Sequence, residues 1–258
     1  MSEVPYAERK RTSYENFVAQ CPWCGHESIF DRATDLKELS PIAFRPVSCL
    51  SLVCEKPFNI NGDSVNSAHE MLVFDRYELL QLKHYMNCIL TLAQAYAVFF
   101  SLFLRAELLY KPFAADPDKD IDQLNLLAEQ LTEKVRDHTF GPMRALFLRQ
   151  LVSGVSPKSF GGAEAVIAAV EDRPKEPADT ELESLPDKQL VALLKAVKET
   201  TINRLRNQVV HKRAYRPTRD EAEAALEESR AVLFPLSQRL RLYDDINWYV
   251  GLKERDGS

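Results

Sequence analysis

Four of the five cysteines fall before residue 55, and they form two pairs. Cys21 and Cys24 are separated by two residues, Cys49 and Cys54 by four, and 24 residues lie between the pairs. A C-x-x-C turn supplies two thiolates from one short stretch of backbone, and tetrahedral zinc binds four thiolates. Because a small module without a sufficient core needs a metal to fold, the spacing predicts a structural Zn²⁺ site. Such a site is closed to substrate, so we do not expect it to be catalytic.

Other interpretations of these cysteines remain open. The pairs are compatible with unrelated reduced thiols, and a C-x-x-C turn also occurs in redox proteins, although the second pair makes that role less favoured. His26 follows the first turn and could replace one thiolate, but a surface position is the simpler expectation. Residues 1–12 are polar and charged without an apolar segment, which argues against a secretory signal and predicts a cytoplasmic protein with reduced thiols.

The composition of the chain and the spacing of its apolar residues change near residue 66. Before it, the sequence is rich in Pro, Cys, Asn and Ser with short apolar runs, and after it apolar residues recur with helical spacing. With 45% hydrophobic residues and only 8 Gly, the composition excludes a disordered or low-complexity chain. We therefore predict a mainly α protein, with a zinc-ribbon-like module over residues 1–65 and a helical domain over residues 66–258.

Helical periods cover residues 70–110, 121–137, 142–152 and 163–171. The part between Lys83 and Arg105 contains no charged residue, but its scattered polar residues and short apolar centre favour a buried bundle helix over a membrane span. We expect no membrane partner, and we expect Cys88 to pack in this helix.

The last third of the chain also has the sequence pattern of helices, after one segment that lacks it. Residues 172–186 are acidic and Pro-rich, which predicts an exposed excursion between helices. Asp187 is a candidate N-cap for one helix running to about residue 211. Pro217 then ends that helix, and Thr218 with Glu221 forms a capping box for a last helix over residues 218–242.

Arg206, Asn207 and His211 form the most informative polar pattern of the helical domain. On a helix, Asn207 and His211 stand one turn apart, so the amide could orient the imidazole. Residues 204–219 hold six basic residues and no acid, in a chain whose net charge is −5. A basic helix end that satisfies its own dipole explains part of this charge. We nevertheless predict a local anion site, with Tyr215 offering a ring on which a base can stack; its expected RNA-binding residues are Arg204, Lys212, Arg213, Tyr215, Arg216 and Arg219.

The Arg206-Asn207 and His211 pattern resembles the R-x4-6-H motif of the HEPN superfamily of α-helical domains, whose ribonucleases often carry a polar residue after the Arg. Some toxin members have Tyr two residues after the His, but Arg213 stands there, so that role is not transferred. The resemblance covers roughly residues 67–242 and implies a HEPN-like helical bundle. It further implies a homodimer in which two motifs form one composite cleft.

The resemblance also implies a metal-independent endoribonuclease acting in toxin or antiviral defence, with a regulatory or antitoxin partner. Its catalytic residues would be Arg206, Asn207 and His211, and the 2′-OH of RNA would be the nucleophile. His211 would move protons and Arg206 would stabilise the phosphate charge. Two alternatives stay open: a non-catalytic HEPN module that binds RNA, nucleotide or protein, and a zinc-ribbon interaction protein whose helical part only dimerises.

Overall fold

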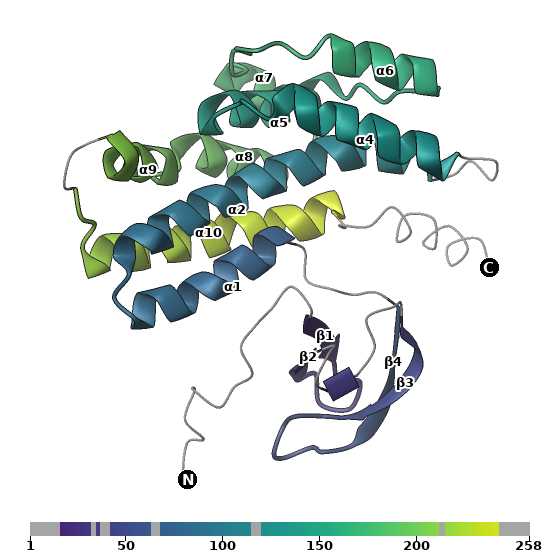
Figure 1. The fold of residues 1–258 in the computed structure, drawn as a ribbon, viewed down its shortest axis with the longest axis vertical. Helices are drawn as coiled ribbons and strands as arrows, with labels where there is room; N and C mark the ends of the chain where they lie inside the picture. Colours follow the sequence, from purple (N-terminus) through teal and green to yellow (C-terminus); the bar gives the residue numbers. More distant parts are fainter. Residues whose placement is uncertain are drawn as a thin grey trace.

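A computed structural model describes residues 16–31, 35–36, 42–62, 68–114, 120–211 and 215–242. The described part is mainly helical, as predicted, with two small sheets near the N-terminus. All described strands lie between Asn16 and Gly62, and all described α-helices lie after residue 67. Figure 1 shows the strands grouped apart from the layered helices.

The N-terminal module consists of two antiparallel hairpins. β1 (Asn16–Gln20) pairs with β2 (Glu27–Asp31), and β3 (Ile42–Ser48) pairs with β4 (Pro57–Gly62). The connection of each hairpin carries one cysteine pair, so each pair sits at a turn. The apolar cluster of this module has only four buried members among the described residues: Ala19, Phe30, Leu36 and Ile60.

The first long helical period is broken in two. α1 (Ala68–Gln81) packs antiparallel against α2 (Tyr85–Arg105), so a turn interrupts the helical period predicted over residues 70–110 (Figure 1). Lys83 has a left-handed backbone with φ 59°, and the amides of Lys83 and His84 donate to the carbonyls of Leu80 and Leu79. This is a Schellman ending, which glycine usually makes. Because lysine occupies the position instead, no residue type marked the turn in advance.

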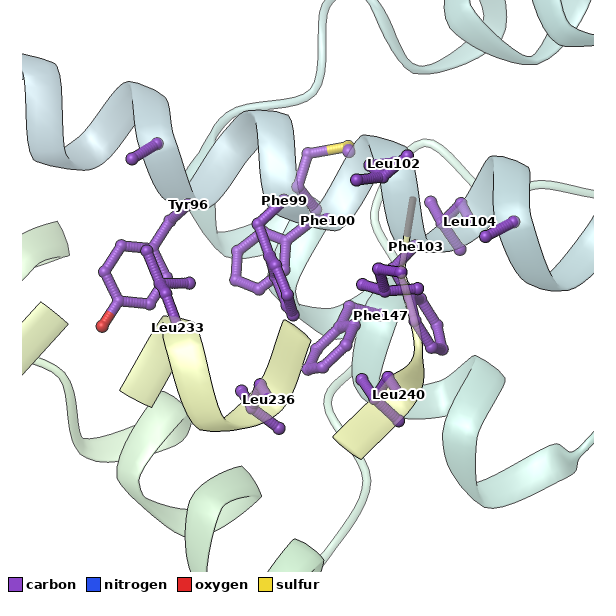
Figure 2. Packing of buried hydrophobic residues seen from close by; sticks show 14 of the residues in the cluster. Tyr96, Phe99, Phe100, Leu102, Phe103, Leu104, Phe147, Leu233, Leu236 and Leu240 are labelled. Atoms are coloured by element: carbon purple, nitrogen blue, oxygen red, sulfur yellow. The ribbon is translucent and has the colours of Figure 1, made fainter. Parts of the chain in front are cut away.

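α2 is the central helix of the bundle. It packs against α1, α5, α9 and α10, and its apolar side is buried from Cys88 to Leu104. It continues as a π-helical turn, η3 (Ala106–Tyr110), and a short α3 (Lys111–Phe113). By length and composition alone the span Tyr85–Phe113 could also cross a membrane, with 56% of its apolar window buried inside the protein. Figure 2 shows aromatic side chains of α2 packed beside Phe147 and leucines of α10.

The other helices are α4 (Ile121–Val135), α5 (Phe140–Ser153), α6 (Phe160–Ala168), α7 (Asp179–Glu183), α8 (Lys188–Glu199), α9 (Ile202–His211) and α10 (Arg219–Leu240). Among them, α4, α5, α6 and α10 lie close to where their periods predict them, whereas α7, α8 and α9 differ from the prediction. Asp187 caps α8 by accepting from the amides of Gln189 and Leu190. Thr218 and Glu221 form the predicted capping box of α10.

Residues 172–186 are not simply exposed. Pro177 and Leu182 are buried, and α7 lies inside this segment. Its acidic residues pair with cations on the bundle: Glu176 with Arg144 at 2.8 Å, and Asp179 with Lys198. The predicted excursion is therefore held against α5 and α8 by charge pairs that join residues far apart in sequence.

The helix predicted to run from Asp187 to about residue 211 is also broken. α8 ends at Glu199, α9 begins at Ile202, and only Thr200 and Thr201 connect them. Both threonine hydroxyls donate to the carboxylate of Glu228 on α10. This contact comes from a distant part of the chain, so the local apolar pattern could not reveal the break.

Replacing Lys83 with glycine should stabilise the protein by about 1 kcal/mol, because a Cβ in the left-handed region is strained and glycine carries none. Equilibrium urea unfolding of the full chain measures this change. Lys83→Ala is the matched control, since it removes the lysine side chain but keeps the Cβ, and it should give no gain. Equal stabilisation by both variants would contradict the backbone explanation.

Candidate functional site

The four paired cysteines meet at one point. Their Sγ atoms all lie within 4.8 Å of one another, so the group could hold a metal ion. Two of these contacts run between the hairpins: Cys21 Sγ to Cys54 Sγ at 3.9 Å, and Cys24 Sγ to Cys49 Sγ at 3.7 Å. Ligands about 2.3 Å from a tetrahedral ion lie about 3.8 Å apart, whereas disulfide sulfurs are about 2.0 Å apart. The separations fit four thiolates around one ion and exclude disulfides.

The two cysteine turns share a backbone design. Gly25 follows the first turn with φ 72° and donates its amide to the carbonyl of Cys21, which a glycine does without strain. Glu55 follows the second turn with φ 46° and donates in the same way to Ser51. Ser51 thus occupies the position that Cys21 has in the first turn, and Cys49 supplies the thiol from two residues earlier. This shift accounts for the longer spacing of the second pair.

The pKa values of two thiols in this cluster shift in opposite directions. Removal from water works against the Cys21 thiolate, but hydrogen bonds from the backbone amides of Trp23 and Cys24 and from the Cys49 and Cys24 side chains outweigh it and lower the pKa of Cys21 to about 7. A backbone hydrogen bond from His26 favours the Cys24 thiolate, yet removal from water and the neighbouring thiols raise its pKa to about 12. Four thiolates this close need a cation between them. His26 itself is exposed, and the four sulfurs form the cluster without it.

The Arg206-Asn207-His211 pattern lies on α9, a short amphipathic helix. Ile202 and Leu205 are buried against the bundle, and His211, its last residue, is exposed. Arg206 is half-buried, and its Nη1 donates to Asn207 Oδ1 at 3.0 Å. The amide of Asn207 donates in turn to Asn203 Oδ1 at 3.4 Å.

These contacts change the role expected of Asn207. Both ends of its amide are engaged, by Arg206 and by Asn203, so the structure pairs it with the guanidinium rather than with the His211 imidazole. An amide is neutral, so this contact leaves the positive charge of Arg206 uncompensated. His211 stands on the same helix with its ring in contact with solvent.

The basic stretch after the motif is partly neutralised. Arg219 Nε donates to Glu223 at 2.7 Å, and the Tyr215 hydroxyl donates to Glu221 Oε1 at 2.6 Å, which raises the pKa of Tyr215. Arg204 and Arg216 are exposed. Lys212 and Arg213 lie outside the described residues. Tyr215 and Arg219 are thus both paired with acidic residues of the first turns of α10.

Three residues missed by sequence reasoning organise this region: Thr200, Thr201 and Glu228. Glu228 Oε2 accepts from the Thr201 hydroxyl at 2.6 Å, and Oε1 accepts from the Thr201 amide at 2.9 Å. No periodicity or motif marks a contact that spans 27 residues. The pair of adjacent β-branched threonines was the one local sign of a break, because such residues stiffen a helix unfavourably.

A cavity of about 460 Å³ lies elsewhere, between α4, α5, α6 and residues 170–181. Leucine and valine side chains from these elements and from Leu104 and Leu108 dominate its lining. Arg206, Asn207 and His211 do not line it. It therefore gives no enclosed pocket to the motif, which faces solvent instead.

Comparison of the chain with protein-family models, with curated proteins and with solved structures gave no significant match. The resemblance to HEPN domains therefore remains a prediction from the residues of the motif.

The cysteine cluster should bind one metal ion per chain with four sulfur ligands. Loading the site with Co²⁺ should give the intense visible absorption of a tetrahedral thiolate site, measured by titration with elemental analysis. Cys24→Ser or Cys54→Ser should weaken binding by at least about 100-fold, since even loss of a group that merely orients a ligand costs roughly 10- to 100-fold. Cys88→Ala is the control, because Cys88 is buried in the bundle. Full affinity after Cys54→Ser would contradict the assignment.

Proposed function

We propose that the protein is a HEPN-type, metal-independent endoribonuclease whose active site is carried by α9. The observation that best supports the proposal is the amphipathic character of α9. Its apolar side, with Ile202 and Leu205, is buried, while Arg206, Asn207 and His211 lie on half-buried or exposed positions within about one and a half turns. A helix fixed on one side and carrying a cation, an amide and an imidazole on the other is suited to a phosphodiester.

The proposed chemistry divides between two side chains. The 2′-OH of RNA attacks the adjacent phosphorus, and His211 accepts the hydroxyl proton or returns one to the leaving oxygen, a role that suits an exposed imidazole. Arg206 stabilises the charge that grows on the phosphate oxygens through paired N–H donors. Asn207 holds the guanidinium by the 3.0 Å hydrogen bond, so in this proposal it orients Arg206. The product would be a 2′,3′-cyclic phosphate.

RNA would reach the motif over its basic surroundings. Arg204 and Arg216 are exposed and available to phosphates, and Tyr215 offers a ring whose hydroxyl is fixed by Glu221. Arg219 would have to exchange its contact with Glu223 for a phosphate. Lys212 and Arg213, outside the described residues, belong to the same proposed surface.

A second copy of the chain would complete the cleft. Large apolar side chains are exposed around the α1–α2 turn and the start of α2: Leu82 at 62%, Met86 at 39% and Leu90 at 36%. Val210, beside His211, is 47% exposed. α9 packs against α2, and the α1–α2 turn lies at the same end of the bundle as the start of α10 (Figure 1). Apolar surface next to the motif supports the proposal of a homodimer.

The N-terminal module would hold Zn²⁺ through Cys21, Cys24, Cys49 and Cys54 and would fold around it. Zinc is preferred over other ions because four thiolates in tetrahedral geometry are its characteristic structural site. A closed site of this kind supports structure, so the ion takes no part in the proposed cleavage. The cytoplasm, where thiols stay reduced, fits this site, and a regulatory or antitoxin partner would restrain the activity.

The test of the proposed activity is cleavage of labelled single-stranded RNA on a denaturing gel, in buffer with EDTA and no added divalent ion. The zinc content of the protein is measured before and after, so that the structural ion is known to remain. The wild type should cleave. His211→Ala should lower the rate by about 10²- to 10⁴-fold, the usual contribution of general acid–base catalysis. Arg230→Ala and His138→Ala are matched controls away from the motif and should cleave normally.

A DNA strand of the same sequence is the chemical control. It lacks the 2′-OH and should remain intact. RNA binding without cleavage by the wild type would favour the non-catalytic HEPN alternative. Cleavage that survives His211→Ala, that requires added Mg²⁺, or that also cuts DNA would contradict the proposal.

A further inference from the structure

Glu228 of α10 contacts the connection at which α8 ends and α9 begins, and so joins these three helices. Its carboxylate accepts from the hydroxyl of Thr200, from the hydroxyl of Thr201 at 2.6 Å and from the amide of Thr201 at 2.9 Å. Glu228 itself lies on α10, which packs against α2 and α8. One carboxylate of the longest helix therefore holds both residues of the α8–α9 connection.

The surroundings of this carboxylate are partly shielded from water, and Glu228 itself is half-buried. Thr200 is only 7% exposed, and Ser229, next to Glu228, is fully buried. The Tyr96 hydroxyl of α2 is buried in the same region, and removal from water raises the pKa of Tyr96 to about 12. Hydrogen bonds to an ionised group are stronger in such surroundings than in water. The three bonds of Glu228 therefore tie both residues of the connection to α10.

The contact also determines how α9 starts. Thr201 is the N-cap, because its carbonyl accepts from the amide of Leu205 at 3.0 Å. Its hydroxyl is turned to Glu228, and the first helical amide, that of Ile202, donates to Thr200 Oγ1 at 3.3 Å. The negative charge of Glu228 lies at the N-terminus of α9, where the helix dipole favours it. Both the starting residue and the direction of α9 therefore depend on Glu228.

We propose that Glu228 is a positioning residue for the proposed nuclease site: it sets the rotation and register of α9 and thereby the placement of Arg206 and His211. This inference rests on the proposed function for its catalytic consequence, although the structural part can be tested without it. Arg206 follows Leu205, whose amide makes the first hydrogen bond of the helix. A shift of the N-cap would move the guanidinium at once, and misplacement by about 1 Å can cost a catalyst roughly 100-fold.

The test compares Glu228→Gln with Glu227→Gln in the full chain. The first substitution would present an amide N–H to the threonine donors, whereas Glu227 is exposed and pairs with Arg230 at 3.5 Å. Glu228→Gln should lower kcat for RNA cleavage by about 10- to 100-fold with KM for RNA changed by no more than about twofold. Amide hydrogen exchange should speed up in the first turn of α9 and stay slow in α2. Glu227→Gln should match the wild type in all three measurements.

A second pair of variants removes the risk that Glu228→Gln fails to fold. Thr201→Val keeps the branched shape and loses the hydroxyl donor, so it should reproduce the fall in kcat. Thr201→Ser keeps the hydroxyl and should retain the wild-type kcat. A merely structural role would not separate these two variants in kcat while leaving KM unchanged.

The outcomes separate this inference from the proposed function. If the wild type does not cleave RNA, the proposed function fails, and hydrogen exchange in α9 still decides whether Glu228 holds the helix. Unchanged exchange in α9 after Glu228→Gln overturns the inference. Faster exchange across the whole bundle would also overturn it, because Glu228 would then contribute to general stability. Faster exchange in α9 alone, with kcat unchanged, would overturn it as well.

Discussion

The aromatic side of α2 is the surface on which the other helices depend for their positions. Phe99, Phe100 and Phe103 all contact Phe147 of α5, with ring centroids 5.5, 5.1 and 4.7 Å apart. These residues are fully buried, and leucines of α10 close the same core (Figure 2). Such ring pairs add about 0.5–1.5 kcal/mol each to the gain from burial. α9 and α10 both pack on α2, so the placement of the motif follows from this core.

The N-terminal module depends on a different source of stability. The apolar cluster of its described residues has four buried members, too small a core for two hairpins to fold alone, because short domains bury a low fraction of their surface. The cysteine turns bring four sulfurs to the separations of a tetrahedral metal site at the tips of the hairpins, so that a bound ion could compensate for the small core. Metal binding and folding are coupled in such modules. The chain thus contains two parts with different sources of stability. An ion would stabilise the N-terminal module, and apolar packing stabilises the helical bundle.

Local signals predicted much of this architecture. Helical periods indicated most helices, Asp187 and the pair of Thr218 and Glu221 marked two helix starts, and the cysteine spacing predicted the sulfur cluster. The predictions failed where a contact distant in sequence or an unusual backbone conformation determined the structure. The α1–α2 turn uses lysine where glycine is expected, and Glu228 holds the break in the helix that was expected to carry the motif.

Side-chain pairing limited what could be predicted of the site. The spacing of Asn207 and His211 correctly placed them on one helix, but it could not show that Arg206 would take the amide of Asn207. The basic run of residues 204–219 was visible in sequence, whereas its partial neutralisation by Glu223 depends on the turn that begins α10. The chemical groups of the site were therefore easier to predict than their partners.

Mixing two inactive variants tests most directly whether two copies of α9 form one catalytic cleft. Arg206→Ala and His211→Ala proteins, each with a different affinity tag, are combined, exchanged and purified through both tags. A mixed dimer retains one guanidinium and one imidazole from different chains, so cleavage of RNA should return to a substantial fraction of the wild-type rate. Mixed dimers that form but remain as inactive as either parent would contradict the composite cleft.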